Sequence, residues 1–384
     1  MSGALLPVYA QFPLRAVSGQ GSWITDDKGE KWLDAYGGHA VASTGHCHPE
    51  VVRAIAEQAA TLIFYSTVLP HSGREQLAEL IAENCPDPLK KVFFCNSGAE
   101  ANENALGLAR KVTGRQKIVS VSGGWHGRTV ATLAVTDGAK YEDGARRAGM
   151  PLSFKVPFND VAAIGAAVDD TVAAVIVEPV QGLTGARDCS TDFLRAARLA
   201  CDREGAVLIF DEIQCGVGRT GTYFAYQLVD PPVMPDIMTA AKPLACGLPF
   251  GIIAAHERAA KAIRPGMHGS TFGGNALSAR VALEFFDILP ELLPAITRVG
   301  DYFRFQLRRL ATRYSYIREV RGFGLMVGVE LAMPGKDIVD NARRAGLLLN
   351  CTHDTVLRFL PPYIITEEHV DEAIGILSQV LPAA

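Results

Sequence analysis

The chain has 384 residues, of which 48% are hydrophobic and 20% charged, a composition typical of a globular protein large enough for two domains. The formal net charge is −4 with both signs interspersed, which argues against nucleic acid as a partner. Because no apolar run reaches the roughly 18 residues of a spanning helix and the N-terminus lacks the pattern of a signal peptide, we expect a cytoplasmic protein that does not bind a membrane.

Helical patterns alternate with short apolar runs through the first two thirds of the chain. The helical stretches cover 49–63, 72–84, 98–112 and 191–204, and the apolar runs cover 91–95, 117–121, 172–177 and 206–210. Short strands that are apolar on both faces and separated by helices are typical of a parallel sheet covered on both sides. The pattern predicts an α/β fold with a mainly parallel central sheet.

The pattern changes near residue 275. Two long helical stretches, about 275–289 and 294–313, lead to an alternating region at 317–331, strands near 347–350 and 356–360, and a closing helix from about 367. We therefore expect a large α/β domain of residues 49–275 and a smaller α+β domain of residues 276–384.

Cysteine and histidine residues give no sign of a metal site. The eight cysteines are scattered without a C-x-x-C pair, as is typical of reduced thiols. The cluster His46-Cys47-His48 lacks a second group of ligands at zinc spacing. We predict a tight turn there, ahead of a helix that begins at Pro49.

Lys242 and Asp211 are the most informative pair of residues. Lys242 lies among small apolar residues, and Asp211 ends the apolar run 206–210. A lysine can form a Schiff base with the aldehyde of pyridoxal phosphate, and a carboxylate can hold the proton on its ring nitrogen. The pair suits that cofactor. On these two residues alone, a surface lysine after a strand-end aspartate is an equally good interpretation.

Three motifs follow predicted strands. Ser97-Gly98-Ala99 opens a helix, whose unpaired N–H groups suit either a phosphate or a capping turn. Trp125 and Arg128 lie in a glycine-rich loop, where an indole can stack on a flat ring and a guanidinium can bind a carboxylate. Residues 178–182 and 211–214 both follow predicted parallel strands, at the edge where open α/β sheets bind ligands.

Two further glycine-rich segments are ambiguous. Residues Gly216–Gly221 match G-x-G-x-x-G, the pattern of a nicotinamide-dependent dehydrogenase, but no helix follows, so we regard that function as a remote alternative. The loop 268–275 contains Ser270 and Thr271 and either contacts a phosphate or simply connects the two domains.

Taken in order, these motifs resemble those of the class III pyridoxal-phosphate aminotransferases, in particular the branch that acts on ornithine and acetylornithine. The series comprises Asn-Ser-Gly-Ala-Glu-Ala-Asn-Glu, His-Gly-Arg-Thr, Glu-Pro-Val-Gln-Gly, Asp-Glu-Ile-Gln, Lys242 and Gly-Ser-Thr-Phe-Gly-Gly-Asn, and the similarity covers nearly the whole chain. The resemblance implies fold type I of the pyridoxal-phosphate-dependent transferases, with the cofactor bound by the large domain and residues 1–48 contributing to the small domain. It also implies a ping-pong transfer of the terminal amino group of N-acetylornithine to 2-oxoglutarate in arginine biosynthesis. Succinylornithine, ornithine, 4-aminobutyrate and acylated lysine derivatives are the alternative donors.

The resemblance also implies a role for each motif. Lys242 would bind the cofactor covalently and move the proton, and Asp211 would hold the ring nitrogen. The other cofactor contacts would come from Ser97, Gly98, Ala99, Trp125, Ile213, Gln214 and, from the partner subunit of a homodimer, Thr271. Arg128 and Ser270 would bind the far end of the acylated ornithine, and Arg358 would bind the α-carboxylate of glutamate or 2-oxoglutarate.

Two positions depart from the family pattern. Leu183 replaces a glutamate that, in relatives, pairs with the arginine matched here by Arg358. Arg358 should therefore remain unmasked or find another partner, which leaves the donor less certain than the acceptor. Pro243 follows Lys242 where relatives carry a small residue, and we expect it to bias Lys242 towards an extended conformation.

Overall fold

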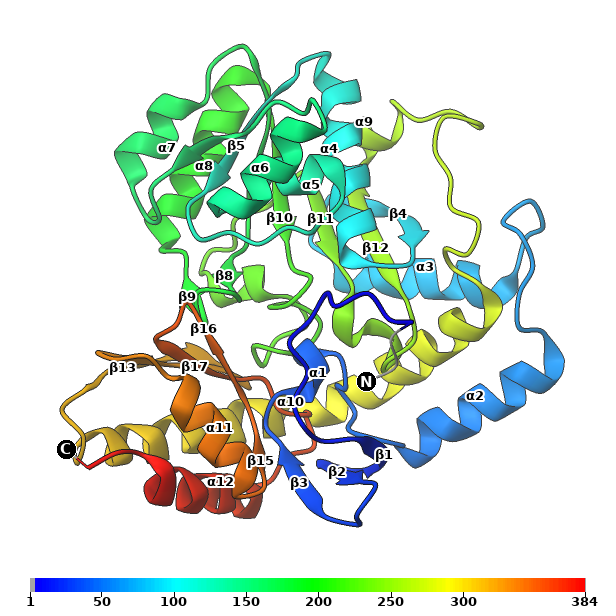
Figure 1. Ribbon diagram of the computed structural model, residues 1–384. Helices are drawn as coiled ribbons and strands as arrows, with labels where there is room; N and C mark the ends of the chain where they lie inside the picture. The colour runs from blue at the N-terminus through cyan, green and yellow to red at the C-terminus, as the bar shows by residue number, and fades with distance from the viewer. Residues whose placement is uncertain (1–3, 384) are drawn as a thin grey trace.

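The computed structural model describes residues 4–383 and has a central sheet of seven strands (Figure 1). In spatial order the strands are β4 (Leu89–Cys95), β12 (Gly251–His256), β11 (Ile237–Ala240), β10 (Val207–Asp211), β7 (Val172–Val177), β5 (Lys117–Val121) and β6 (Phe154–Val156). Only β12 runs antiparallel to its neighbours within this sheet. The expected α/β fold with a mainly parallel sheet is therefore confirmed.

Helices cover both faces of this sheet because its strands are apolar on both sides. Val207 and Ile209 of β10 pack in one hydrophobic cluster with residues of α4 (Gly98–Thr113), whereas Leu208 and Phe210 pack in another with residues of α8 (Thr191–Glu204). The remaining helical elements of the large domain are α2 (Pro49–Thr61), α3 (Ser72–Asn84), α5 (Val130–Val135), α6 (Ala139–Arg147), α7 (Val161–Ala167), η1 (Ala225–Leu228), η2 (Lys242–Ala245) and α9 (Glu257–Ala260). Every position of β7 and β10 is buried, as expected for strands covered on both faces.

The C-terminal part forms a smaller antiparallel sheet. Its strands are β13 (Ile317–Phe323), β14 (Met326–Leu331), β17 (Val356–Phe359) and β16 (Asn350–Thr352), and its helices are α11 (Lys336–Arg344) and α12 (Glu367–Val380). The N-terminal strands join this part of the molecule, because β3 (Lys31–Asp34) pairs in parallel with β15 (Leu347–Leu348). The other short elements are β1 (Ala16–Gln20), β2 (Trp23–Asp26), α1 (Gly37–Ala40) and the strands of a hairpin, β8 (Val180–Gln181) and β9 (Arg187–Asp188).

A single helix, α10 (Ala276–Ala311), joins the two parts, so the prediction of two helices was wrong. Pro290 and Pro294 lie inside this helix. Proline removes a helical hydrogen bond and usually kinks or ends a helix, which is why the sequence pattern favoured a break. The helix packs on α2 and α3 and also on α12, β13 and β14. These contacts keep it helical at and beyond the two prolines. Among residues 4–383, no helix is both long and apolar enough to cross a lipid bilayer.

Candidate active site

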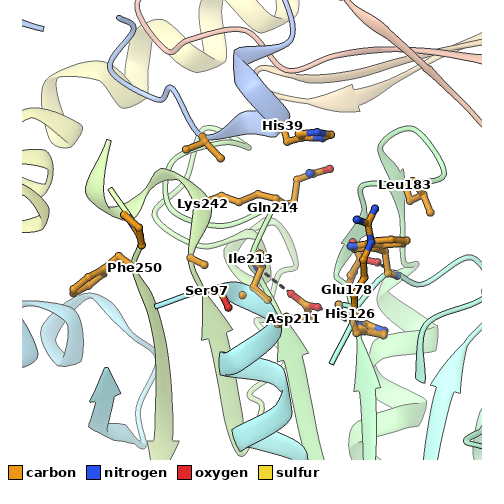
Figure 2. A pocket seen from close by; sticks show the side chains of 18 of the residues that line it. His39, Ser97, His126, Glu178, Leu183, Asp211, Ile213, Gln214, Lys242 and Phe250 are labelled. Carbon is orange, nitrogen blue, oxygen red and sulfur yellow. Dashed lines mark hydrogen bonds and ion pairs between the residues drawn. The ribbon is translucent and has the colours of Figure 1, made fainter. Parts of the chain in front are cut away.

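The carboxyl ends of the central strands open into a cavity of about 630 Å³ between the two domains (Figure 2). Ten of the predicted site residues line it: Ser97, Gly98, Ala99, Trp125, Arg128, Asp211, Ile213, Gln214, Lys242 and Arg358. Asp211, His126 and Glu178 lie together at the strand ends, and Lys242 and His39 lie across the cavity from them. Residues from distant parts of the sequence therefore meet here, as the strand-end motifs predicted.

Lys242 follows β11 after one intervening residue and begins the short helix η2. Burial lowers the pKa of its amine to about 8, with Asp211 and Glu178 opposing that shift and Arg358 adding to it. A much larger fraction of this amine than of an ordinary lysine is therefore uncharged and nucleophilic near neutral pH. The expectation that Pro243 would hold Lys242 extended was wrong, because its φ is +21°. The chain turns sharply from the strand into η2, and this turn overrides the local preference of a residue before proline.

Asp211 is 2% exposed at the end of β10 and accepts several hydrogen bonds. His126 Nδ1 lies 2.7 Å from its Oδ2, and the backbone N–H of Ile213 donates to its Oδ1 at 3.0 Å. His126 is also buried, and its Nε2 has no hydrogen-bond partner among the described residues. These hydrogen bonds hold the carboxylate in place where it lines the cavity.

The first turn of α4 supplies an anion-binding end to the cavity. Ser97 caps the helix by accepting a hydrogen bond from the backbone N–H of Glu100 at 3.1 Å. The first N–H groups of the helix, those of Gly98 and Ala99, have no acceptor within the helix. The hydroxyl hydrogen of Ser97 has none either. A Cβ atom on Gly98 would lie 2.7 Å from the side chain of Ile213, so only glycine fits at this position. The geometry suits a phosphate group.

Trp125 and Arg128 lie at the side of the cavity. The Trp125 ring meets Tyr141 edge-on at 4.9 Å, and the Arg128 guanidinium lies 5.2 Å from the centre of the Trp125 ring. Arg128 also donates a hydrogen bond to the Tyr9 hydroxyl at 3.0 Å. The exposed guanidinium is therefore held by aromatic groups rather than by a carboxylate, and it is free to bind one.

Arg358 lies on β17 and is 4% exposed. Its Nη1 donates to the carbonyl of Gly182 at 2.9 Å and to Gln214 Oε1 at 3.2 Å, and its Nε donates to Asn350 Oδ1 at 3.2 Å. All three acceptors are neutral, and Leu183 lines the cavity beside them. The buried charge therefore keeps its capacity to bind a carboxylate.

Glu178 connects the Trp125 loop with the Gly182 loop. Its two carboxylate oxygens accept the backbone N–H groups of Trp125 at 2.7 Å and Gly182 at 3.0 Å. Burial, together with the charge of Asp211, raises the pKa of Glu178 to about 7, while His126 and the two N–H groups oppose the shift. The sequence places Glu178 at a strand end without indicating a role for it, and its contacts place it in the site.

Two predicted site residues do not line the cavity of their own chain. Ser270 donates a hydrogen bond to Glu100 Oε1 at 3.2 Å and accepts one from Asn96 Nδ2 at 3.0 Å. Thr271 is exposed on the neighbouring surface. A contribution of Thr271 to the site of a second subunit remains a prediction. Ser270 could likewise contact substrate only in the cavity of a second subunit.

The segment Gly216–Gly221 forms a turn and opens no helix, so it lacks the geometry of a dinucleotide site. Arg219, within it, is fully buried and donates to the carbonyls of Leu325 and Pro361. Its guanidinium also lies 4.5 Å from the centre of the Tyr363 ring. This motif therefore links the large domain to the small one.

The histidine cluster near residue 46 also has a structural role. His46 Nε2 lies 2.9 Å from Asp34 Oδ2, and Pro49 is the first residue of α2. Within residues 4–383, no group of three or more His, Cys, Asp or Glu side chains is arranged to hold a metal ion.

The cavity fits pyridoxal phosphate. It offers an amine of lowered pKa at Lys242, a buried carboxylate at Asp211 and a helix N-terminus at Gly98. These three groups match the aldehyde, the ring nitrogen and the phosphate of the cofactor.

Comparisons with known proteins agree with this chemistry. Residues 7–381 match the sequence profile of the aminotransferase class III family. The chain belongs to the class III aminotransferases. This family uses pyridoxal phosphate, so the chain is a pyridoxal-phosphate-dependent transaminase.

Individual relatives match over nearly the full chain. The acetylornithine aminotransferase of Methanocaldococcus jannaschii is 45% identical, and the alignment covers 98% of this chain and 95% of the relative. A structure of the Toxoplasma gondii ornithine aminotransferase with pyridoxal phosphate at partial occupancy has a TM-score of 0.91 at 31% identity and covers 98% and 91% of the two chains. The N-acetylornithine aminotransferase of Stenotrophomonas maltophilia has a TM-score of 0.82 at 33% identity and covers 96% and 95%.

Sequence reasoning missed several residues of the site. Tyr9, His39, His126, Glu178 and Asn350 all line the cavity, yet none was assigned a role. His126 and Glu178 could have been found, because both belong to motifs that follow strands. Tyr9 and His39 could not, because no local pattern indicates that the N-terminal segment crosses the mouth of the cavity.

Proposed function

We propose that this transaminase transfers the terminal amino group of N-acetylornithine to 2-oxoglutarate, as in arginine biosynthesis. The observation that carries the proposal is one cavity lined by Lys242, Asp211 and two guanidinium groups, those of Arg128 and Arg358, neither of which is paired with a carboxylate among the described residues. Two separate cationic receptors suit a reaction in which both substrates carry carboxylates. The 45% identity to an acetylornithine aminotransferase supports the same donor.

Each group has a defined task in this proposal. When bound, pyridoxal phosphate supplies a carbonyl that accepts the amino group and a ring that delocalises electrons from the substrate carbon. Lys242 binds the cofactor and moves the proton at the reacting carbon, and Asp211 keeps the ring nitrogen protonated. Ser97, Gly98 and Ala99 bind the phosphate. A positioned acid or base such as Lys242 contributes a rate factor of roughly 10² to 10⁴.

Other side chains orient the cofactor ring and the substrates. Trp125 and Ile213 would pack against the cofactor ring, and Gln214 would approach its oxygen. Arg128, with Ser270 contributed by a second subunit, binds the carboxylate end of the acylated ornithine. Arg358 binds the α-carboxylate of glutamate or 2-oxoglutarate, because its charge is buried among neutral acceptors.

A panel of amines tests the donor. The purified enzyme is mixed in single turnovers with acetylornithine, succinylornithine, ornithine and 4-aminobutyrate, and the absorbance of the bound cofactor is followed. Acetylornithine should change the spectrum fastest, and Lys242→Ala should lack the wild-type band that borohydride removes. If acetylornithine leaves the spectrum unchanged while another amine converts it, the donor assignment is wrong.

We further propose a homodimer whose subunits share active sites, with Thr271 completing the phosphate site of its partner. Exposed apolar side chains beside Thr271 support an interface there. They are Leu62, Ile63, Phe64, Tyr65, Val68, Leu69 and Phe272, and the rings of Phe64 and Phe272 lie 5.5 Å apart.

Subunit mixing tests this arrangement. Lys242→Ala and Thr271→Asp should each be nearly inactive alone, the second because its carboxylate repels the phosphate. If sites are shared, a mixed dimer contains one site with both native residues, and about a quarter of the wild-type activity should return in a fully exchanged mixture. No recovery after verified subunit exchange would show that Thr271 acts within its own chain.

We also propose that the enzyme acts in the cytoplasm. All eight cysteines are free, which fits a reducing compartment. Cell fractionation with an antibody tests this, and recovery of the protein with the membrane or extracellular fraction would contradict it.

A further inference from the structure

Asn102 is fully buried on α4 and touches Asp211 directly. Its Nδ2 donates to Asp211 Oδ2 at 2.7 Å and to the backbone carbonyl of His126 at 2.9 Å. Its Oδ1 accepts from Thr239 Oγ1 at 2.7 Å. A buried amide is costly unless it is hydrogen-bonded, and here both N–H groups and the oxygen have partners. Asn102 therefore connects α4, β10 and β11 through polar contacts alone.

The Asp211 carboxylate and the His126 carbonyl set the orientation of the Asn102 amide, and the hydroxyl of Thr239 satisfies its oxygen. An amide has nearly the same shape when its oxygen and nitrogen are exchanged, so its neighbours decide which way it points. A flipped Asn102 would place its oxygen against the Asp211 carboxylate and the His126 carbonyl, which are both acceptors. Thr239 cannot move away easily, because its Cα pairs with that of Asp211 in the parallel sheet. The amide is thus held with its NH₂ towards Asp211.

A count of acceptor sites shows what this achieves. A carboxylate has about four lone-pair sites. Asn102 and His126 occupy those of Asp211 Oδ2, and the N–H of Ile213 occupies one on Oδ1. One site on Oδ1 is left on a side chain that lines the cavity. The carboxylate therefore has a single acceptor position for an N–H group of a ligand.

We propose that Asn102, whose amide oxygen is anchored by the hydroxyl of Thr239, is a positioning residue that fixes the Asp211 carboxylate so that its one free acceptor position faces the ring nitrogen of the cofactor. The inference rests on the proposed role of Asp211. Asn102 and Thr239 touch neither substrate nor cofactor, and they act through Asp211 alone. Removing either hydrogen bond should let the carboxylate turn and should weaken its hold on the ring proton.

The central experiment compares Thr239→Val with Thr239→Ser in the enzyme loaded with pyridoxal phosphate. Valine replaces only the hydroxyl with a methyl group, whereas serine keeps the hydroxyl. For Thr239→Val we expect kcat to fall about 10-fold with KM changed less than about threefold. We also expect a shift of roughly one unit in the pH at which the absorbance of the bound cofactor changes. Thr239→Ser should restore both values.

Two further variants separate positioning from folding. Asn102→Leu keeps a similar volume without hydrogen bonds and should lower kcat about 10- to 100-fold. Thr113→Val removes a hydroxyl from the far end of α4, where it donates to the carbonyl of Ala109, and should leave both kcat and the spectrum unchanged. Thermal unfolding of each cofactor-free protein reports the purely structural effect.

The outcomes distinguish this inference from the proposed function. If wild-type enzyme binds pyridoxal phosphate at Lys242 but Thr239→Val has the wild-type kcat and spectral midpoint, the positioning role is overturned and the function stands. The positioning role is also overturned if Thr239→Val loses thermal stability but keeps the wild-type kcat and spectral midpoint. If Asn102→Leu does not fold, Thr239→Val decides alone. Wild-type enzyme that takes up no cofactor would overturn the function and this inference together.

Discussion

The lowered pKa of Lys242 predicts how fast the cofactor-free enzyme captures pyridoxal phosphate at each pH. Only an uncharged amine attacks an aldehyde. With a pKa of about 8, about one Lys242 in ten is uncharged at pH 7, against about one in three thousand at the ordinary value of 10.5. At neutral pH, the uncharged fraction of Lys242 is therefore about 300-fold larger than that of an ordinary lysine.

The assay compares two rates. The covalent attachment of pyridoxal phosphate to the cofactor-free enzyme is followed by absorbance from about pH 6 to about pH 10, at constant ionic strength. Each rate is divided by the rate at which a free lysine analogue reacts with pyridoxal phosphate at the same pH. The ratio is then independent of the protonation of the cofactor itself. The ratio should stay level up to about pH 8, where both amines gain neutral form equally, and fall above it as Lys242 saturates.

Neighbouring charges supply matched perturbations of opposite sign. Asp211 and Glu178 raise the pKa of Lys242, and Arg358 lowers it. Glu178→Gln should move the bend in the ratio to lower pH, and Arg358→Met should move it to higher pH. A ratio that stays level to about pH 10 in the wild type would refute the reasoning, because Lys242 would then titrate like an ordinary lysine.

Three other predictions follow from the same structure. Leu183→Glu should raise KM for 2-oxoglutarate about tenfold or more, because the new carboxylate pairs with Arg358, and it should affect the acetylornithine half-reaction differently. Leu183→Gln is the neutral control. Equal changes in both half-reactions would show that the glutamate does not mask the charge of Arg358. Burial raises the pKa of Glu212 to about 8, so its contribution to stability is complete below the ordinary pKa of 4.5 and is lost as the pH rises through about 8. Urea unfolding of the cofactor-free Glu212→Gln protein should lack this loss, on the order of 5 kcal/mol, and a pH dependence equal to that of the wild type would refute it. Arg219→Met should lower the free energy of unfolding by about 2–4 kcal/mol, since it removes hydrogen bonds to two carbonyls and the contact with Tyr363; an unchanged urea midpoint would show that these contacts contribute nothing.

Local patterns predicted the individual elements well. The apolar runs at 117–121 and 172–177 are β5 and β7, and the helix expected at 191–204 is α8. Periodicity succeeds here because it reflects which faces of a single element are buried.

The errors have a common cause. Pro290 and Pro294 indicated a helix break, but contacts with elements from both domains keep α10 continuous. The strand Gly251–His256 was not predicted, and nothing in its residues specifies that it runs antiparallel between β4 and β11. In both cases packing against distant segments overrides or supplements the local preference.

The sequence by itself determined which chemical groups are present and in what order. It placed an amine at Lys242 and a carboxylate at Asp211, and strand ends carried the motifs that indicate the family. Only the tertiary structure decided what surrounds these groups: that Asn102 and His126 hold Asp211, and that neutral acceptors hold Arg358. The hydrogen bond between Asn102 and Asp211 spans 109 positions of the chain. Such contacts depend on how whole elements pack, and no spacing between neighbouring residues encodes them.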